Sequence, residues 1–282
     1  GKVSIDSTKQ NNDPIIVGYD ENRKEIKRNL AIENETRSLS FSGNKENHIL
    51  NALKNTYEVT GIDDKVTGSI INAYETAVIF KSAENKKLTL SGTIVNGGLG
   101  INTNKIAISG SEKGDILILQ SGDIECTING EKKTVTQNTI VNGNINMEDG
   151  NDILTIENGT IINGTLGGGA DNDTLNFNSP LTRAAKNDEI NILHNISDFE
   201  NININTNVTL FEKTIGTDLK VTGAGNITIG KNGVLTLRMD STNKDTSSGK
   251  IVGHALSENT GKIFSADGGK LLITLNGAGN EN

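Results

Sequence analysis

Three aspartates lie close together in the sequence at a point where metal binding is the chemistry to consider. Asp171 and Asp173 belong to the stretch GGADNDTL at residues 168–175, and Asp152 belongs to the related stretch GNDIL at residues 150–154. Carboxylate oxygens and backbone carbonyls are the ligands that Ca²⁺ prefers in proteins. Asp152, Asp171 and Asp173 are therefore the candidate ligands of a calcium site.

The fit of this stretch to a calcium-binding repeat is incomplete. Residues 168–175 are similar to the pattern G-G-x-G-x-D-x-U-x, but Asp171 stands where the pattern requires glycine. The two aspartate stretches recur after 21 residues, whereas calcium-binding turns of this kind follow one another roughly every nine residues. The interpretation that we favour is that Asp152 and Asp173 stack at one corner of a repeated structure and accept hydrogen bonds from backbone N–H groups. On that interpretation we expect no cofactor. The alternative is that these aspartates bind Ca²⁺.

The same acidic residues permit an enzymatic hypothesis, the cleavage of a glycan. Such enzymes place two carboxylates on one face, and Asp149 would join the three aspartates across adjacent turns of the chain. Sugar-binding clefts are usually lined by aromatic side chains, yet the chain has no Trp and only three Tyr. The three histidines occur in unrelated contexts and no G-x-S-x-G is present, so a serine hydrolase is not indicated. We expect that the chain is not an enzyme.

Two copies of one phrase contain these aspartates. The first copy, TIVNGNINMEDGNDILTI, begins at Thr139, and the second, TIINGTLGGGADNDTLNF, begins 21 residues later at Thr160. A third copy begins at Thr93 and a weaker fourth at Ser69, 24 residues before it. The 46 residues between Thr93 and Thr139 are interpreted as two steps of 23. A fixed period of roughly 21–24 residues is typical of a solenoid.

The composition favours a solenoid built of strands. Apolar residues make up 33% of the chain and aromatic residues 3%, which suits a thin core in which each coil contacts only the next one. Short runs of Ile, Val and Thr suit strands, and the 32 glycines together with many Asn-Gly pairs suit tight corners. The sequence therefore predicts an all-β fold, a parallel β-helix of about ten coils.

The repeat does not reach the beginning of the chain. Residues 1–57 are predicted to form a cap or irregular first coils, with local helical spacing at residues 49–53, and a separate functional head is the alternative. Residues 58–282 are predicted to form the β-helix, with residues 131–133 as a charged loop. Polar insertions lie near residues 183–189 and 240–250, and insertions in solenoids are often where partners bind. The candidate binding residues in these two loops are Arg183, Asn187, Asp188, Asp240, Lys244 and Asp245.

Charge and cysteine content exclude several classes of function. The net charge is −8 and no basic stripe is present, so neither nucleic acid nor an anionic membrane is an expected partner. One cysteine, Cys126, excludes an intrachain disulfide framework. Cys126 alternates with Ile124 and Ile128, so we expect it to be a small buried apolar side chain rather than a nucleophile.

The coils from about Thr93 onward resemble the passenger regions of bacterial type V secreted proteins, the autotransporters. The resemblance is closest to the large Asn-rich passengers of fusobacteria, and it covers roughly residues 93–275. The motifs that carry it are structural, so they support the fold more than a particular activity. The segments that carry it lie at residues 142–156, 161–177, 196–204 and 226–237.

The resemblance implies a right-handed parallel β-helix that is exported through a C-terminal outer-membrane β-barrel of the same precursor. The passenger would be extracellular, on the bacterial cell surface, and would act in adhesion or display, with a host cell-surface protein or glycan as its partner. The alternative is a structural stalk that follows an upstream subtilisin-like protease domain, whose motifs this chain does not contain. No functional residue can be carried over, because the shared pattern belongs to the scaffold.

Overall fold

The chain folds into an all-β structure. A computed structural model describes residues 14–37, 41–101, 104–180, 189–211, 220–240 and 262–276. Every regular element in these ranges is a strand, and the described part of the chain contains no helix that could span a membrane. Several of its sheets are parallel, which is compatible with the predicted β-helix. The class prediction, all-β, is confirmed.

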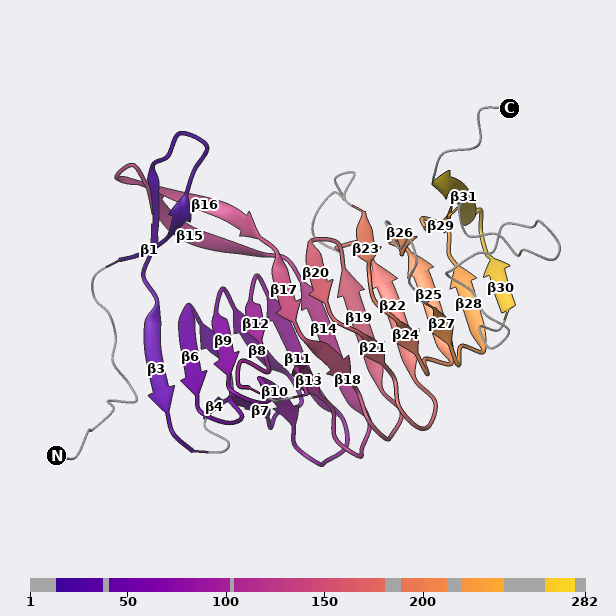
Figure 1. Ribbon diagram of the computed structural model, residues 1–282, viewed down its shortest axis with the longest axis horizontal. Coiled ribbons are helices and arrows are strands. Elements are labelled where there is room, and N and C mark those ends of the chain that lie inside the picture. Colours follow the sequence, from indigo (N-terminus) through magenta and orange to yellow (C-terminus); the bar gives the residue numbers. More distant parts are fainter. Residues whose placement is uncertain are drawn as a thin grey trace.

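Three parallel sheets carry most of the strands and run along an elongated body (Figure 1). Sheet 1 consists of β3 (Ala31–Glu35), β6 (His48–Ala52), β9 (Ile70–Ala73), β12 (Ile94–Asn96), β17 (Thr139–Asn142) and β20 (Thr160–Asn163). Sheet 2 consists of β4 (Phe41–Ser42), β7 (Tyr57–Val59), β10 (Val78–Phe80), β13 (Ile106–Ser109), β18 (Asn144–Asn146), β21 (Leu166–Gly167), β24 (Ile196–Ser197) and β27 (Val221–Thr222). Sheet 3 consists of β5 (Lys45–Glu46), β8 (Asp64–Thr67), β11 (Lys86–Ser91), β14 (Asp115–Gln120), β19 (Ile153–Glu157), β22 (Thr174–Asn178), β25 (Asn201–Asn205), β28 (Asn226–Ile229) and β30 (Lys262–Ser265).

Two smaller sheets complete the structure. Sheet 4 is parallel and consists of β23 (Ile190–Ile192), β26 (Asn207–Leu210), β29 (Val234–Asp240) and β31 (Lys270–Asn276). The fifth sheet, here called the wing, is antiparallel and consists of β1 (Ile15–Tyr19), β2 (Glu25–Arg28), β15 (Gly122–Ile128) and β16 (Glu131–Gln137). In Figure 1 the wing projects from the upper left of the body.

The chain visits the parallel sheets in a fixed rotation. From β3 to β14 it passes from sheet 1 to sheet 2, then to sheet 3 and back to sheet 1, and one such passage is here called a circuit. From β23 to β29, sheet 4 takes the place of sheet 1 in the rotation, and β23 contacts β20. The last two described strands, β30 and β31, extend sheets 3 and 4. Within each parallel sheet, every strand except the two at its ends pairs in parallel with the strand of the circuit before it and with that of the circuit after it.

The register of the strands follows the sequence repeat. Thr139 is paired with Thr160, and Asn142 with Asn163, as the offset of 21 residues predicts. The interpretation of the 46 residues before Thr139 was wrong, because β12 pairs directly with β17 and Ile94 faces Ile140. Those 46 residues form one circuit rather than two. The hairpin of β15 and β16 fills the additional length, so residues 131–133 lie in a strand and not in a loop.

Parallel pairing begins before residue 58. The strands β3, β4 and β5 pair with β6, β7 and β8, so the first described circuit begins at Ala31. Residues 49–53 do not form a helix, because four of them lie in β6, where Leu50 and Ala52 point into the core. Apolar residues that alternate with polar ones along a short segment are the pattern of a half-buried strand rather than of a helix.

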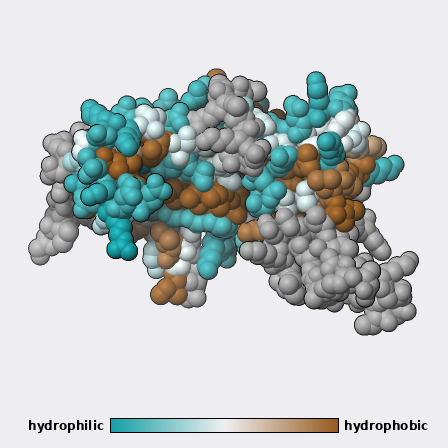
Figure 2. All heavy atoms as spheres, turned by 90° about the horizontal axis from the view of Figure 1, so that it is seen from above, coloured by the Kyte–Doolittle hydropathy of each residue, from teal (hydrophilic) through white to brown (hydrophobic). Residues whose placement is uncertain are grey.

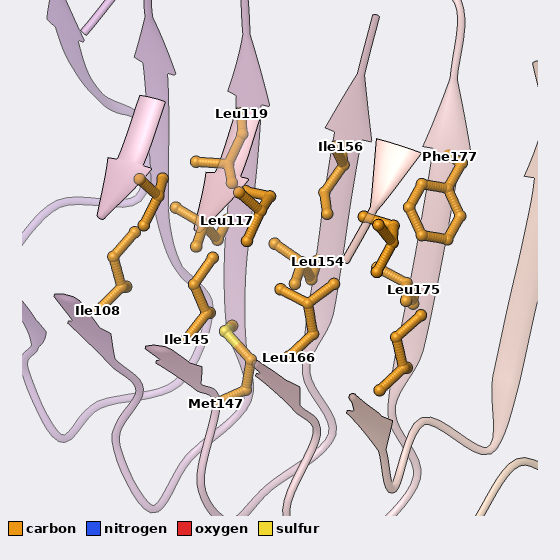
Figure 3. Close-up of a cluster of buried hydrophobic side chains, with 14 of the residues drawn as sticks. Ile108, Leu117, Leu119, Ile145, Met147, Leu154, Ile156, Leu166, Leu175 and Phe177 are labelled. Carbon is orange, nitrogen blue, oxygen red and sulfur yellow. The ribbon is translucent and has the colours of Figure 1, made fainter. Parts of the chain in front are cut away.

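The core is a continuous stack of apolar side chains enclosed by the sheets. Alternate residues of each strand point inward, as Leu117 and Leu119 of β14 do, and the same positions of β19 hold Leu154 and Ile156. Figure 3 shows these side chains stacked in rows from circuit to circuit, with Phe177 at one end. Each circuit buries its apolar face only against its neighbours, which is the packing expected of a repeat protein.

Polar side chains form two further columns along sheet 1. On the outer face, each of Asn51, Asn72, Asn96, Asn142 and Asn163 donates an amide N–H to the Oδ1 of the asparagine in the preceding circuit, at 2.7–2.9 Å. Inside, at the corner before sheet 1, hydroxyl groups cap backbone amides. The N–H of Ser69 donates to Thr93 Oγ1 at 3.3 Å, and that of Thr93 donates to Thr139 Oγ1 at 3.1 Å.

Candidate functional site

A ladder of four carboxylates, Asp115, Asp152, Asp173 and Glu200, runs along the corner before sheet 3. Each of these residues directly precedes or begins a strand of that sheet. The backbone N–H of Asp115 donates to Asp152 Oδ1 at 2.8 Å, and that of Asp152 donates to Asp173 Oδ1 at 2.8 Å. The N–H of Asp173 donates to Glu200 Oε1 at 2.7 Å. The prediction that Asp152 and Asp173 stack at one corner and cap backbone amides is confirmed.

The ladder is buried among other acidic groups. Asp115 and Asp173 are fully buried and Asp152 is 1% exposed. Burial raises the pKa of Asp115 to about 6, while hydrogen bonds from Ser111 oppose the rise and Glu84 adds to it. Burial also raises the pKa of Asp152 and of Asp173, with further contributions from the neighbouring carboxylates of the ladder. A buried carboxyl group without a cation nearby is more stable with its proton than without it.

The geometry of the three candidate calcium ligands separates Asp171 from the other two. Asp171 is exposed, and its Oδ2 accepts a hydrogen bond from the N–H of Gly150 at 2.9 Å. In Asp152 and Asp173, Oδ1 caps a backbone amide and Oδ2 is buried without a hydrogen-bond partner. Two buried oxygens are far fewer than the roughly six to eight that Ca²⁺ takes. Among the described residues no group of three or more His, Cys, Asp or Glu side chains is arranged to hold a metal ion. Calcium binding by Asp152, Asp171 and Asp173 therefore remains a prediction.

The predicted binding loops fall almost entirely outside the described residues. Arg183, Asn187, Asp188, Lys244 and Asp245 lie outside them, and Asp240 is described only by its backbone at the end of β29. Cys126 lies within them, on β15, and its predicted burial is confirmed because it is 4% exposed.

The wing is the feature that the sequence interpretation missed. It joins two hairpins that are about one hundred residues apart in the chain, because β15 pairs with β2 through Thr127 and Lys27. A local signal for the second hairpin is present in the sequence. Asn129-Gly130 joins two segments of alternating residues, and this dipeptide is the strongest short-range indication of a β-hairpin.

Buried contacts attach the wing to the body. The guanidinium group of Arg28, 4% exposed, donates to the carbonyl of Gly68 at 2.7 Å and to Asn47 Oδ1 at 3.0 Å. Its burial lowers the pKa of Arg28 below the ordinary value. At the base of β15, Gly122 lies so close to Gly92 that a Cβ atom would be 2.9 Å from the Gly92 nitrogen. Only glycine permits the hairpin to leave the body at this point.

We expect the substitution Arg28→Ala to loosen the wing. It leaves the Gly68 carbonyl and the Asn47 amide oxygen without their charged donor, at a cost of about 2–3 kcal/mol in the free energy of unfolding. Amide hydrogen exchange in residues 122–137 should become faster, while exchange in β19 and β22 stays unchanged. Arg23→Ala, at the exposed tip, is the matched control. Unchanged exchange in the hairpin of the Arg28 variant would show that other contacts hold the wing.

The tip of the wing contains a hollow of about 350 Å³ between its two hairpin turns. The Nζ of Lys27 lies 3.3 Å from the Oε2 of Glu25, so this ion pair balances the negative charge of Glu25. The side chains of Arg23 and Lys24 are exposed and form no ion pair with any described residue. The residues that line the hollow are Arg23, Lys24, Glu25, Lys27, Thr127, Asn129 and Gly130.

Comparison of the chain with protein-family models, with curated proteins and with solved structures finds no match. The function must therefore be argued from the geometry of the ladder, the body and the wing.

Proposed function

We propose that the body is a right-handed parallel β-helix of about ten coils. The support is the fixed rotation of the chain through three faces, which accounts for the order of the strands from β3 to β29 except the hairpin of the wing. Successive strands of each sheet are parallel, and parallel strands joined by a crossover are right-handed in about 98% of cases.

We further propose that this chain is the passenger region of an autotransporter, extracellular and held at the bacterial cell surface by the outer-membrane β-barrel of its precursor. In this proposal the passenger acts in adhesion or display, and its partner is a host cell-surface protein or glycan. The observation that carries the proposal is the wing, a projecting sheet with a polar hollow on an otherwise repetitive body (Figure 1). Figure 2 shows hydrophilic side chains over much of the left part of the upper face, from which the wing projects in Figure 1.

A glycan-cleaving activity receives less support from the geometry. The carboxylates that would act as acid and base are Asp152 and Asp173, and both are buried with one oxygen committed to a backbone amide. General acid or base catalysis requires a carboxyl group within hydrogen-bond reach of the substrate. We therefore propose a binding protein rather than an enzyme.

Binding of the labelled, purified chain to epithelial cells, with and without Ca²⁺, tests this proposal. We expect saturable binding that does not depend on Ca²⁺. Because Gly122 is paired with Gln137, the hairpin can be removed by joining Ser121 to Asn138 through two glycines without stretching the body. This deletion should abolish cell binding while the far-UV circular dichroism of the β-structure remains. A separate deletion of residues 183–189 tests the other insertion that the sequence predicts to bind a partner. Absence of saturable binding by the intact chain would contradict the adhesive function and favour the stalk.

A further inference from the structure

We infer that the hollow at the tip of the wing binds the sulfate or carboxylate substituents of an acidic polysaccharide. This inference rests on the proposed adhesive function and assigns it a ligand class and a set of residues. It is carried by the exposed cations at the tip, by the shape of the hollow and by the chemistry of its lining.

The tip is ordered by its own hydrogen bonds. Asp20 Oδ1 accepts hydrogen bonds from the backbone N–H groups of Asn22 at 2.9 Å and Lys24 at 2.7 Å. Arg23 adopts a left-handed backbone conformation with φ of 61°, and Asn129 does so in the opposite turn with φ of 52°. The pairing of β2 with β15 holds the two turns side by side. The hollow that Arg23 and Lys24 line is therefore formed before any ligand binds.

The charge of the hollow is opposite to that of the whole chain. Arg23, Lys24 and Lys27 contribute three positive charges and Glu25 one negative charge, so the lining has a net charge of +2 (3 − 1) on a chain of net charge −8. Because Glu25 is already paired with Lys27, Arg23 and Lys24 are the cations available to a ligand. A guanidinium group binds a planar or tetrahedral oxyanion through two parallel hydrogen bonds.

The rest of the lining indicates a sugar rather than an acidic peptide. Three lining residues supply hydrogen-bonding groups that suit sugar hydroxyls. These groups are the hydroxyl of Thr127, the side-chain amide of Asn129 and the backbone of Gly130. None of the lining residues has a large apolar side chain, and a volume of about 350 Å³ is at the small end of ligand sites. A peptide would usually add a strand to a free sheet edge. At this hollow the facing edges of β2 and β15 are already paired with each other.

The test measures binding of the intact chain to a heparin-derived hexasaccharide and to the same hexasaccharide after desulfation. We expect saturable binding of the sulfated form only. The double variant Arg23→Ala/Lys24→Ala should bind it about 100-fold more weakly, because each lost charge-assisted contact corresponds to about a tenfold change. The control is Lys65→Ala/Lys81→Ala, which removes the same charge from exposed positions of the body.

Each outcome supports or overturns the inference. Loss of affinity in the tip variant alone supports it. Equal losses in the tip variant and the control variant, or equal binding of a single-stranded DNA of matched charge, would show unspecific attraction and overturn it. Failure of the intact chain to bind the sulfated sugar would overturn it as well.

Cell binding separates this inference from the adhesive function. If Arg23→Ala/Lys24→Ala binds cells as well as the unchanged chain, whereas removal of the hairpin abolishes binding, the ligand assignment fails and the adhesive function stands. If the intact chain does not bind cells but the sulfated sugar is still bound through Arg23 and Lys24, the adhesive function fails and the site stands.

Discussion

We expect the protein to lose stability as the pH rises from about 4 through neutrality, with the buried acidic ladder as the cause. An unfolded aspartate has a pKa of about 3.9, whereas the pKa of Asp115 in the fold is about 6. A group whose pKa is raised by folding binds its proton more tightly in the folded state. Its contribution is therefore complete below the unfolded pKa and is lost as the pH rises through the folded pKa. For Asp115 alone, a shift of about two pKa units corresponds to about 3 kcal/mol.

Asp152 and Asp173 extend this loss to higher pH, because their pKa values are raised as well. Among the described residues, the charged groups whose charge raises the pKa values of the ladder are all acidic: Glu84 beside Asp115, Asp171 and Glu200 beside Asp173, and the ladder members beside one another. No cation compensates the negative charge that deprotonation creates among these facing groups. The loss should therefore exceed that from Asp115 alone and continue above pH 6.

The substitution Asp152→Asn tests the origin of this pH dependence. The asparagine keeps an amide oxygen for the N–H of Asp115 and removes the titrating group. Thermal melting followed by circular dichroism should show a higher Tm than the unchanged chain at pH 8 and a flatter dependence of Tm on pH. Glu21→Gln, at an exposed position of the wing, is the control, because it removes one acidic group without altering the ladder. A Tm that rises between pH 5 and pH 8 in the unchanged chain would contradict the expectation.

The second large effect is expected for Phe177→Ala. Phe177 is fully buried and lies between Ile156 and Ile204, its partners in the circuits before and after it. Removal of a buried aromatic side chain costs about 3–5 kcal/mol, since the surrounding structure collapses only partly into the space left behind. Stacked circuits cannot easily close such a gap, because each one is fixed in register by its neighbours.

Urea unfolding gives the free energy for this comparison, and hydrogen exchange shows where the loss occurs. We expect accelerated exchange in β19, β22 and β25, on both sides of the gap. Ile161→Ala, on the outer face of β20 where Ile161 is 42% exposed, is the matched control and should change stability by less than about 1 kcal/mol. A loss below about 1 kcal/mol for Phe177→Ala would show that the core repacks around the missing ring.

The sequence predicted those features that repeat along the chain. The offset between Thr139 and Thr160 is the register of β17 with β20, and the aspartates that recur at the same offset do cap backbone amides. The wing could not be read in this way, because its central pairing of Thr127 with Lys27 joins segments with no common period. The length of this segment also hid the hairpin of β15 and β16 from the sequence interpretation. The 46 residues from Thr93 to Thr139 equal two steps of the repeat, although the chain makes only one circuit there. The hollow at the tip also depends on this long-range pairing, which brings Asn129 and Gly130 beside Arg23 and Lys24.

The buried side-chain caps all point the same way along the body, from a backbone N–H to a side chain of the next circuit. Removing circuits from one end of the body therefore differs from removing them from the other end. The buried amides of Ser69, Thr93, Asp115 and Asp152 each donate to a side chain that the following circuit supplies. Truncation from the C-terminal side therefore removes the side-chain acceptor of the N–H in the new last circuit, so that water at the newly exposed end must replace it. Truncation from the N-terminal side removes only the donor and leaves a side-chain oxygen at a surface that water can reach. In fragments that keep the C-terminal circuits, every one of these amides that remains keeps its side-chain acceptor, so we expect the body to tolerate shortening from its beginning better.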